Sequence, residues 1–371
     1  MVRRITWMKA LILSNNGMGL YKFRKELIIE LLNKNYEVTV AFPKDEYVKE
    51  FVSLGCRFIN TNVDRRGVNP IKDIALMIQY IKLIIQTKPD IVLTYTIKPN
   101  IYGGIACQLT KTKYLSTITG LGTAVQNKGI LRVVTLNLYK LALRRANCTF
   151  FQNEKNKEIF ENEEILRGFN KVVPGSGVNV SEFQLEPYPK ELVDIELIFI
   201  GRIMKDKGIN ELLIAIRAIK EKYSRIQFSL IGICEEEYHT QLKEMEDQGL
   251  LNYYGKQNDV QSYIKRSHAI ILPSYHEGLS NVLLEAASSG RPILASDIPG
   301  CQETFDENIS GISFRAKDSA SLIRSIEKFL NLTHLEKEKM GFCGRSKIVN
   351  EFDRNIVVTQ YISEIEKMRC E

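Results

Sequence analysis

Short apolar runs alternate with amphipathic stretches along most of the chain, and this alternation predicts its fold class. The strands predicted in the first half are residues 10–13, 37–42, 57–60 and 90–94. The helices predicted between them are residues 21–32, 44–54 and 71–87. Repeated strand–helix–strand units predict an α/β protein whose parallel sheet carries helices on both faces. Ligands of such sheets bind outside the carboxyl ends of the strands.

The same pattern starts again in the second half of the chain. The strands predicted there are residues 195–203, 226–233, 253–255, 269–272 and 292–295. The pattern breaks near residues 173–179, and a proline-containing segment at 186–189 is typical of an extended linker. A chain of 371 residues is also too long for one core of usual size. We therefore expect a first domain at 1–185, a second at 186–353 and a terminal helix at 354–371.

The segment after the strand at 269–272 is the first candidate for a site. A glycine loop leads there into a helix whose apolar stripe is formed by Leu279, Val282, Leu283, Ala286 and Ala287. Glu277 lies in the loop and Glu285 lies off the stripe in the second turn. A helix start suits an anion, and ionised carboxylates accept several hydrogen bonds from hydroxyl groups. A ligand with a diphosphate and many hydroxyls meets both demands; alternatively, the two acids are ordinary solvated helix-start residues.

Two cations and a glycine follow other strands of the second half. Arg202 and Lys207 surround a strand-to-helix turn, and a helix is predicted from about Ile209. The two cations could neutralise a diphosphate there, or they are plain surface charges. Gly232 ends a strand in the position of a turn at the same edge.

The first half offers loops of its own. The segment after strand one contains Gly19 and a second glycine, and it is either a phosphate loop or a tight turn, because no complete Gly-x-Gly-x-x-Gly is present. The segments 94–104 and 116–124 are expected to be glycine-rich loops at one sheet edge. Their polar groups, Lys98, Asn100, Thr119 and Thr123, could bind a sugar acceptor, although turn chemistry alone also explains them.

The helix predicted at 131–145 combines an apolar stripe with four basic residues. It could rest on a membrane surface, and a core-packed helix with a solvated basic edge is the favoured alternative. No stretch approaches the roughly 20 apolar residues that a bilayer span needs. The net charge of +7 is compatible with phosphorylated ligands or anionic membranes, whereas no aromatic–basic repeat points to nucleic acid.

The cysteine content and the N-terminal residues indicate the cellular compartment of the protein. The seven cysteines are scattered without a Cys-x-x-Cys pair, and only four histidines are present, so neither a disulfide framework nor a structural zinc site is expected. Reduced thiols in a cytoplasmic protein are the simpler account. The apolar run near the start is too short for a secretion signal and is expected to be strand one after an extension, with Met8 as an alternative start.

The segment Pro-Ser-Tyr-His-Glu-Gly-Leu-Ser-Asn-Val-Leu-Leu-Glu-Ala, which contains Glu277 and Glu285, resembles the signature of the family-4 retaining glycosyltransferases. Gly201-Arg202 and Lys207-Gly208 are similar to the family's pyrophosphate-binding pair. The first half is similar to family members that extend capsule, O-antigen or glycoprotein glycans on a lipid carrier. The resemblance implies the GT-B arrangement: two Rossmann-like, doubly wound parallel-sheet domains facing a cleft, with the donor on the second and the acceptor on the first.

The resemblance also implies roles for single residues. Glu277 would contact hydroxyls of the transferred sugar, Glu285 would hold the ribose, and Arg202 and Lys207 would stabilise the leaving diphosphate. The other donor-binding residues would be Gly278, Leu279, Ser280, Gly232 and Gly19. The acceptor-side residues would be Lys98, Asn100, Thr119 and Gly120. Many relatives carry a histidine where this chain has Tyr95, so an acceptor-side histidine role is not carried over.

The implied function is a retaining hexosyltransferase that moves a hexose or N-acetylhexosamine from a UDP-sugar to a lipid-diphosphate-linked saccharide. It would act peripherally at the inner face of the cell membrane. No Asp-x-Asp motif is present, so we expect neither a metal nor another cofactor. The alternatives are a sugar-nucleotide epimerase of the same fold and a non-catalytic membrane-associated scaffold.

Overall fold

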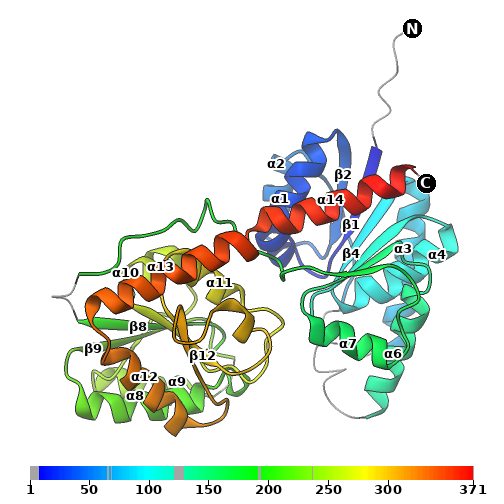
Figure 1. The fold of residues 1–371 in the computed structure, drawn as a ribbon. Helices are drawn as coiled ribbons and strands as arrows, with labels where there is room; N and C mark the ends of the chain where they lie inside the picture. Colours follow the sequence, from blue (N-terminus) through cyan, green and yellow to red (C-terminus); the bar gives the residue numbers. More distant parts are fainter. Residues whose placement is uncertain are drawn as a thin grey trace. The chain divides into compact units, whose positions relative to one another are not determined.

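The computed structural model describes residues 8–64, 67, 69–120, 129–190, 194–235 and 237–370. The chain forms two compact units. The first contains the chain up to Ser176 and resumes at Asn355, and the second is Gly177–Arg354 (Figure 1).

The first unit is built on a seven-stranded parallel sheet with the order β3-β2-β1-β4-β5-β6-β7. Its strands are β1 (Met8–Leu13), β2 (Tyr36–Phe42), β3 (Arg57–Asn60), β4 (Ile91–Tyr95), β5 (Tyr114–Ile118), β6 (Cys148–Phe151) and β7 (Asn170–Val172). Successive side chains of β1 point to opposite faces, so Ala10 and Ile12 pack in one core and Leu11 and Leu13 in the other. The sheet is therefore buried on both faces.

Helices cover each face of this sheet. One layer packs on the core that contains Ile12 and consists of α1 (Gly17–Asn33), α2 (Val48–Ser53) and α14 (Arg354–Cys370). The opposite layer packs on the core that contains Leu11 and consists of α3 (Pro70–Thr87), α4 (Gly104–Thr110), α6 (Ile130–Leu143) and α7 (Glu154–Asn162). The terminal helix α14 thus completes the first unit, because residues from Val357 to Met368 are part of its core.

The second unit repeats the design with a six-stranded parallel sheet of order β10-β9-β8-β11-β12-β13. The strands are β8 (Ile195–Ile200), β9 (Ile226–Ile231), β10 (Asn252–Tyr253), β11 (Ala269–Leu272), β12 (Ile293–Ser296) and β13 (Gly311–Phe314). The helices are α8 (Ile209–Lys222), α9 (His239–Asp247), α10 (Gln261–Arg266), α11 (Asn281–Ser288), α12 (Ser319–Leu330) and α13 (His334–Glu351), and they lie on both sides of the sheet (Figure 1). The strand order reverses between β8 and β11, which is where ligands bind in open α/β sheets.

The two-sheet α/β architecture predicted from the alternation of apolar and amphipathic stretches is confirmed. Residues 177–185, which the sequence analysis assigned to the first domain, belong to the second unit. Val178 donates its backbone N–H to Phe352 and accepts from Arg354, and Phe183 is buried in the second core. These contacts explain why the chain joins the second unit before the proline-containing segment.

The expectation of a glycine-rich loop at 94–104 is wrong. Residues Pro99–Gly103 form a π-helical turn that continues into α4. A Cβ atom on Gly103 would lie 2.8 Å from Leu13 Cδ1, and one on Gly104 would lie 2.8 Å from the Ala142 carbonyl oxygen. The two glycines therefore allow helices and strand to pack closely, and they do not form a mobile turn.

Candidate functional site

An ion pair lies at the switch point of the second sheet. Glu277, in the loop between β11 and α11, accepts hydrogen bonds through Oε1 from Lys207 Nζ at 2.5 Å and from Ser274 Oγ at 2.7 Å. The side chains of Lys207 and Glu277 are only 18% and 15% exposed. The structure thus brings together two residues that the sequence analysis selected separately. Ser274, which the sequence analysis did not assign a role, fixes the same carboxylate oxygen.

Backbone contacts hold the two loops of this pair together. Lys207 ends a short 3-10 turn (Lys205–Lys207), and Gly208 follows in a left-handed conformation with φ of +70°. A Cβ atom at Gly208 would lie 2.0 Å from the Pro273 carbonyl oxygen, so only glycine fits. The backbone N–H of Tyr275 donates to Asp206 O at 2.9 Å. The loops after β8 and β11 are therefore one packed assembly.

Further glycines bring neighbouring loops to the same edge. Gly232, just after β9, has φ of +148°, and a Cβ there would lie 1.7 Å from the Gly201 carbonyl oxygen. Gly300 has φ of +87°, and its Cβ would lie 2.7 Å from Gly278 O and 2.8 Å from Glu277 O. The backbone is consequently close-packed around Glu277, as a site that a ligand approaches through backbone groups requires.

Helix α11 presents the other predicted donor-side residues. Leu279 and Ser280 are buried just before the helix, and Ser280 N donates to Gly300 O at 2.8 Å. Glu285 lies half-buried in the second turn, off the buried stripe that contains Leu283 and Ala286. The helix and the placement of Glu285 are therefore confirmed, and the predicted stripe is confirmed in part: Leu283, Ala286 and Ala287 are buried, whereas Val282 is half-buried and Leu279 lies before the helix.

Arg202 stands between β8 and the 3-10 turn with a partner of its own. Its guanidinium Nη1 donates to Glu235 Oε2 at 2.9 Å, and its side chain is 49% exposed. Glu235 follows β9, so this exposed pair joins the ends of two adjacent strands. Glu235 was not predicted as a site residue, because no sequence motif marks it.

A second hydrogen-bonded pair supports the same loops. The Tyr275 hydroxyl donates to both carboxylate oxygens of Glu211, at 2.9 and 2.8 Å, and Lys317 Nζ lies 4.8 Å from the centre of the Tyr275 ring. Burial, followed by the hydrogen bond to Glu211, raises the pKa of the Tyr275 hydroxyl. The tyrosine therefore stays protonated and holds the loop against α8.

In the first unit, the segment that contains Gly19 forms a capped helix start. Asn16 is the N-cap of α1, and its side-chain oxygen accepts from Gly19 N at 2.6 Å. The backbone N–H of Gly17 donates to Asp45 Oδ2 at 2.7 Å. Two of the N–H groups that a phosphate would use are therefore bonded to this chain's own side chains.

The predicted acceptor-side residues lie in different environments of the first unit. Lys98 forms an ion pair with Asp73 at 2.6 Å, and Tyr102 donates to the other oxygen of that carboxylate at 3.0 Å. Asn100 is fully buried, with its amide bonded to Thr94 and the Thr117 carbonyl, so it stabilises the interior. Thr119 and Gly120 are half-buried after β5, and the rest of the 116–124 segment, from 121, lies outside the described residues.

Tyr95, which stands where many relatives carry a histidine, is buried beside the guanidinium of Arg24. The guanidinium carbon of Arg24 lies 4.9 Å from the Tyr95 ring centre and 5.8 Å from that of Tyr361. Burial raises the pKa of the Tyr95 hydroxyl, which has no hydrogen-bond partner within the described structure. Tyr95 is a packed aromatic residue here.

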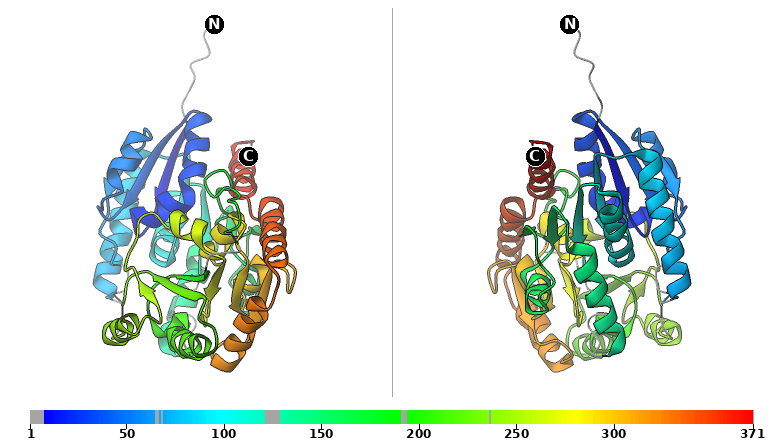
Figure 2. Two further views of the ribbon diagram at one scale, coloured as in Figure 1. Left: turned by 90° about the vertical axis from the view of Figure 1, so that its left-hand side faces the viewer. Right: turned by 90° about the vertical axis from the view of Figure 1, so that its right-hand side faces the viewer.

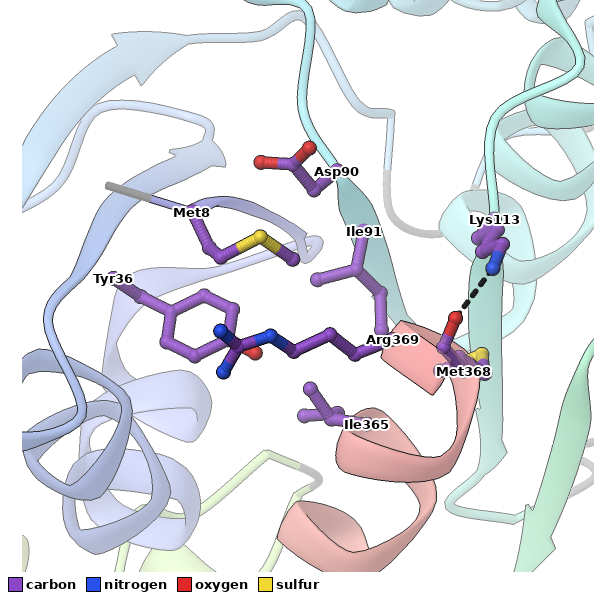
Figure 3. A pocket seen from close by; sticks show the side chains of 8 residues that line it. All are labelled: Met8, Tyr36, Asp90, Ile91, Lys113, Ile365, Met368 and Arg369. Carbon is purple, nitrogen blue, oxygen red and sulfur yellow. Dashed lines mark hydrogen bonds between the residues drawn. The ribbon is translucent and has the colours of Figure 1, made fainter. Parts of the chain in front are cut away.

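Two of the cavities in the described part of the first unit lie at opposite edges of its sheet. One of about 690 Å³ lies at the carboxyl ends of β2 and β3, and its polar lining residues are Asn60, Thr61, Asn62, Asp64, Lys72 and Gln79. The other, of about 250 Å³, lies at the amino ends of β1 and β4, where Met8 and Tyr36 lie beside Arg369 of α14 (Figure 3). Lys113 donates there to the Met368 carbonyl oxygen. Only the first cavity lies at the edge where α/β sheets bind ligands.

No group of three or more His, Cys, Asp or Glu side chains among the described residues is placed to hold a metal ion. None of the helices in that part of the chain combines the length and hydropathy that crossing a membrane requires.

Comparisons with known proteins cover both units. Residues 181–344 match the family model described as glycosyl transferases group 1, and residues 9–153 match the model described as glycosyl transferase 4-like. An N,N'-diacetylbacillosaminyl-diphospho-undecaprenol alpha-1,3-N-acetylgalactosaminyltransferase of Campylobacter jejuni is 26% identical, over 96% of this chain and 98% of the relative. A UDP-Gal:alpha-D-GlcNAc-diphosphoundecaprenol alpha-1,3-galactosyltransferase of Escherichia coli is 25% identical, over 87% of each.

Solved structures share the fold over nearly the whole chain. A glycosyltransferase from Rickettsia africae has a TM-score of 0.80 at 19% identity, covering 98% of this chain and 99% of its own. Anabaena Alr3699/HepE in complex with UDP and glucose has a TM-score of 0.78 at 15% identity, covering 97% of this chain and 99% of its own. These likenesses identify the architecture of both units.

Proposed function

The chain belongs to the GT-B glycosyltransferases, and on that premise we propose that it moves a hexose or N-acetylhexosamine from a UDP-sugar to a lipid-diphosphate-linked saccharide, with retention of the anomeric configuration. The observation that carries this proposal is the Lys207–Glu277 pair at the switch point of the second sheet. A cation and a carboxylate held there can serve a donor that has a diphosphate at one end and sugar hydroxyls at the other.

The leaving group determines the roles proposed for the cations. As the bond between the anomeric carbon and the diphosphate breaks, negative charge grows on the diphosphate oxygens. Arg202 and Lys207 would stabilise that charge in the transition state. Lys207 is positioned for this before the donor arrives, because Glu277 and the packed turn at Gly208 restrict its side chain. We propose that these two cations supply the charge compensation and that transfer needs no metal or other cofactor.

The carboxylates would hold the two sugar parts of the donor. Glu277 Oε1 already accepts from Lys207 and Ser274, which leaves Oε2 for hydroxyls of the transferred sugar. Glu285 would hold the ribose hydroxyls from the second turn of α11. The close-packed backbone at Gly278, Leu279, Ser280 and Gly232 would line the donor. Gly19 would have only a supporting role, because its backbone N–H is already bonded to the side chain of Asn16 at the start of α1.

Retention would follow from attack on the same face that the leaving group departs from. The acceptor hydroxyl oxygen forms a bond to the anomeric carbon, the bond from that carbon to the diphosphate oxygen breaks, and the hydroxyl proton passes to the diphosphate. The names of the C. jejuni and E. coli relatives both specify alpha-1,3 transfer, and the second specifies a UDP donor. An α-linked product from an α-linked UDP-sugar is a retained configuration, which supports the proposal.

The acceptor would be a saccharide on a lipid diphosphate, as the same two names state for those relatives. We place it on the first unit, where Lys98, Thr119 and Gly120 lie near the carboxyl edge of the sheet and Asn100 holds that edge from inside. The polar cavity beside β2 and β3 gives the saccharide a further surface. With a lipid-linked acceptor, the enzyme would act peripherally at the inner face of the cell membrane.

A donor panel tests this function. The purified chain is incubated with single UDP-sugars in excess chelator, with and without membrane extract that contains lipid-linked saccharides, and UDP release is measured. We expect release with one donor and only when acceptor is present. Release without acceptor would indicate hydrolysis, altered sugar without release would indicate an epimerase, and no reaction with any donor would favour a scaffold.

A further inference from the structure

The outer surface of the first unit carries an unusual set of exposed apolar side chains. Ten of the 21 large hydrophobic residues that are exposed in the described chain lie on α3, α4 and α6. They are Ile71, Ile74, Ile78, Ile85, Leu109, Ile130, Leu131, Val133, Val134 and Leu141. The three helices are neighbours in one layer on the sheet (Figure 2). We refer to the outward side of these helices as the α3–α4–α6 face.

The spacing shows that these residues form continuous stripes. On α3, Ile71, Ile74, Ile78 and Ile85 follow one another at helical intervals, with exposed Lys82 in the same row. The opposite side of α3 is buried through Leu76, Tyr80, Leu83 and Ile84. The helix is therefore apolar on its solvent side as well as on its core side, which is not typical of the surface of a monomer.

Helix α6 has the same organisation. Ile130, Val133, Val134 and Leu141 form its outward side, while Leu136 and Tyr139 pack on the core. The sequence offered two alternatives for this segment, a core-packed helix or a membrane-bound one. The structure shows the core packing and, on the opposite side, an apolar surface that this packing does not use.

The face carries an excess of basic residues. Between residues 70–88, 104–111 and 129–145 the only carboxylate is Asp73, which is paired with Lys98 away from solvent. Two carboxylates from neighbouring segments pair with basic residues of these helices, Asp64 with Lys72 at 3.7 Å and Glu163 with Arg132 at 2.7 Å. The exposed basic residues of the same segments are Lys72, Lys82, Lys88, Lys111, Arg144 and Arg145. The next helix of the layer, α7, carries Glu154, Glu158 and Glu161 and so bounds the face. Apolar side chains among an excess of basic ones suit a surface of anionic lipid headgroups over acyl chains.

The most exposed apolar residues of the face lie at the carboxyl edge of the first sheet, where an acceptor lipid would bind. Helices α3 and α6 connect parallel strands and therefore run back from the carboxyl edge of the sheet, so their first turns lie at that edge. Ile71 and Ile130 stand in these first turns and are 80% and 84% exposed. Thr119 and Gly120, at the end of β5, mark the same edge.

We propose that the α3–α4–α6 face is the membrane-docking surface of this enzyme, which inserts aliphatic side chains into an anionic bilayer and brings the carboxyl edge of the first sheet to lipid-linked acceptors. The proposal rests on the proposed function for its choice of occupant. A second copy of the chain, which would also bury apolar surface, would leave the basic residues of two like faces opposed to each other.

Vesicle co-sedimentation of the full chain tests this surface without any turnover. The variants are Ile71→Gln/Ile74→Gln/Ile78→Gln on α3, Ile130→Gln/Val133→Gln on α6 and Arg144→Glu/Arg145→Glu. The matched control is Ile214→Gln/Leu335→Gln, which removes equally exposed apolar side chains from α8 and α13. Vesicles are phosphatidylcholine alone or with phosphatidylglycerol. Thermal unfolding of each variant reports its folding.

We expect the wild type and the control to bind vesicles with phosphatidylglycerol, and each α3, α6 or arginine variant to bind about tenfold less tightly or worse. Hydrogen exchange of the wild type should slow in α3 and α6 on vesicle addition, which tests the surface even if a variant does not fold. Absent wild-type binding, unchanged binding of all three variants, or a wild-type dimer that the α3 and α6 variants dissociate would overturn the proposal. Binding without any transferase activity would leave the docking surface standing and reject the proposed function alone.

Discussion

Lys207 and Glu277 lie 70 residues apart in the chain, and their side chains meet at 2.5 Å where the strand order of the second sheet reverses. Each side chain comes from a loop that follows a central strand, and Gly208 and Pro273 hold the two loops together. The pair is nearly buried yet lies at the edge where ligands of such sheets bind. This relationship is the structural basis of the proposed transferase.

Replacing Glu277 with glutamine should abolish most transfer while the fold and UDP affinity persist. Glutamine keeps an oxygen for Ser274 and Lys207 but removes the negative charge that accepts sugar hydroxyls. We expect turnover to fall on the order of 100-fold. Glu327→Gln is the matched control, since Glu327 pairs with Lys222 at 2.7 Å in the same unit. Wild-type turnover of Glu277→Gln would exclude a role in transfer.

Arg202→Ala should weaken donor binding far more than it weakens the fold. The Arg202–Glu235 pair is exposed, and such pairs stabilise proteins by about 1 kcal/mol or less. Loss of a charge-assisted hydrogen bond to diphosphate should raise the Kd for UDP-sugar about tenfold or more. Arg225→Ala removes a comparably exposed arginine, which pairs with Asp194, and should leave the Kd unchanged. Titration calorimetry gives both values, and equal donor affinity for Arg202→Ala would remove the diphosphate role.

Gly208→Ala should separate backbone strain from steric overlap when it is compared with Gly249→Ala. Both glycines are left-handed, with φ of +70° and +67°, but a Cβ at Gly249 meets nothing within 4 Å. We expect Gly249→Ala to cost about 1 kcal/mol and Gly208→Ala to cost about 2 kcal/mol more, because of the Pro273 carbonyl. Urea denaturation measures the difference, and equal costs would show that the two loops are not locked together.

A buried histidine should make stability fall in mild acid. Burial, followed by Arg291, His334 and Lys337, lowers the pKa of His268 to about 4, and its Nδ1 accepts from Glu196 N at 3.0 Å. Between pH 6.5 and 4 the unfolded state therefore binds more protons than the folded state, so stability decreases as pH falls through this window. The His268 contribution to the loss should reach about 3 kcal/mol or less at pH 4.

His268→Gln, which keeps an acceptor for Glu196, isolates that contribution. The variant should show a flatter decline of unfolding free energy across the same window, measured by denaturation at several pH values. Parallel pH curves for the wild type and the variant would contradict the assignment.

The second unit was largely predictable because its signals are local. The strand at 269–272, the helix start at Ile209 and the buried positions Leu283, Ala286 and Ala287 of α11 follow from spacing alone. Spacing left Glu277 and Lys207 open between a site and ordinary surface charges, and the resemblance to the family's motifs selected them as candidates. Their contact could not be predicted, because it depends on which strands neighbour each other in the sheet. Ser274 and Glu235 remained hidden for the same reason.

The first unit was less predictable because its residues have tertiary partners that no local pattern shows. Gly103 and Gly104 have the composition of a loop, yet they serve close packing against Leu13 and Ala142. Lys98 is bonded to Asp73, which lies 25 residues earlier. Helix α3 is apolar nearly all round, so periodicity could not tell its buried stripe from its exposed one. Only the folded unit shows which side is left to solvent.

The measurement that tests the central claim most directly is the mass of the acceptor lipid after reaction. The purified chain, its preferred UDP-sugar and a lipid-diphosphate-linked saccharide are incubated in excess chelator, and the extracted glycolipid is analysed by mass spectrometry for the wild type and Glu277→Gln. The account predicts that the wild type adds one hexose or N-acetylhexosamine to the lipid and that the variant adds almost none. An unchanged lipid mass in the wild-type reaction, while the UDP-sugar is consumed, would contradict it.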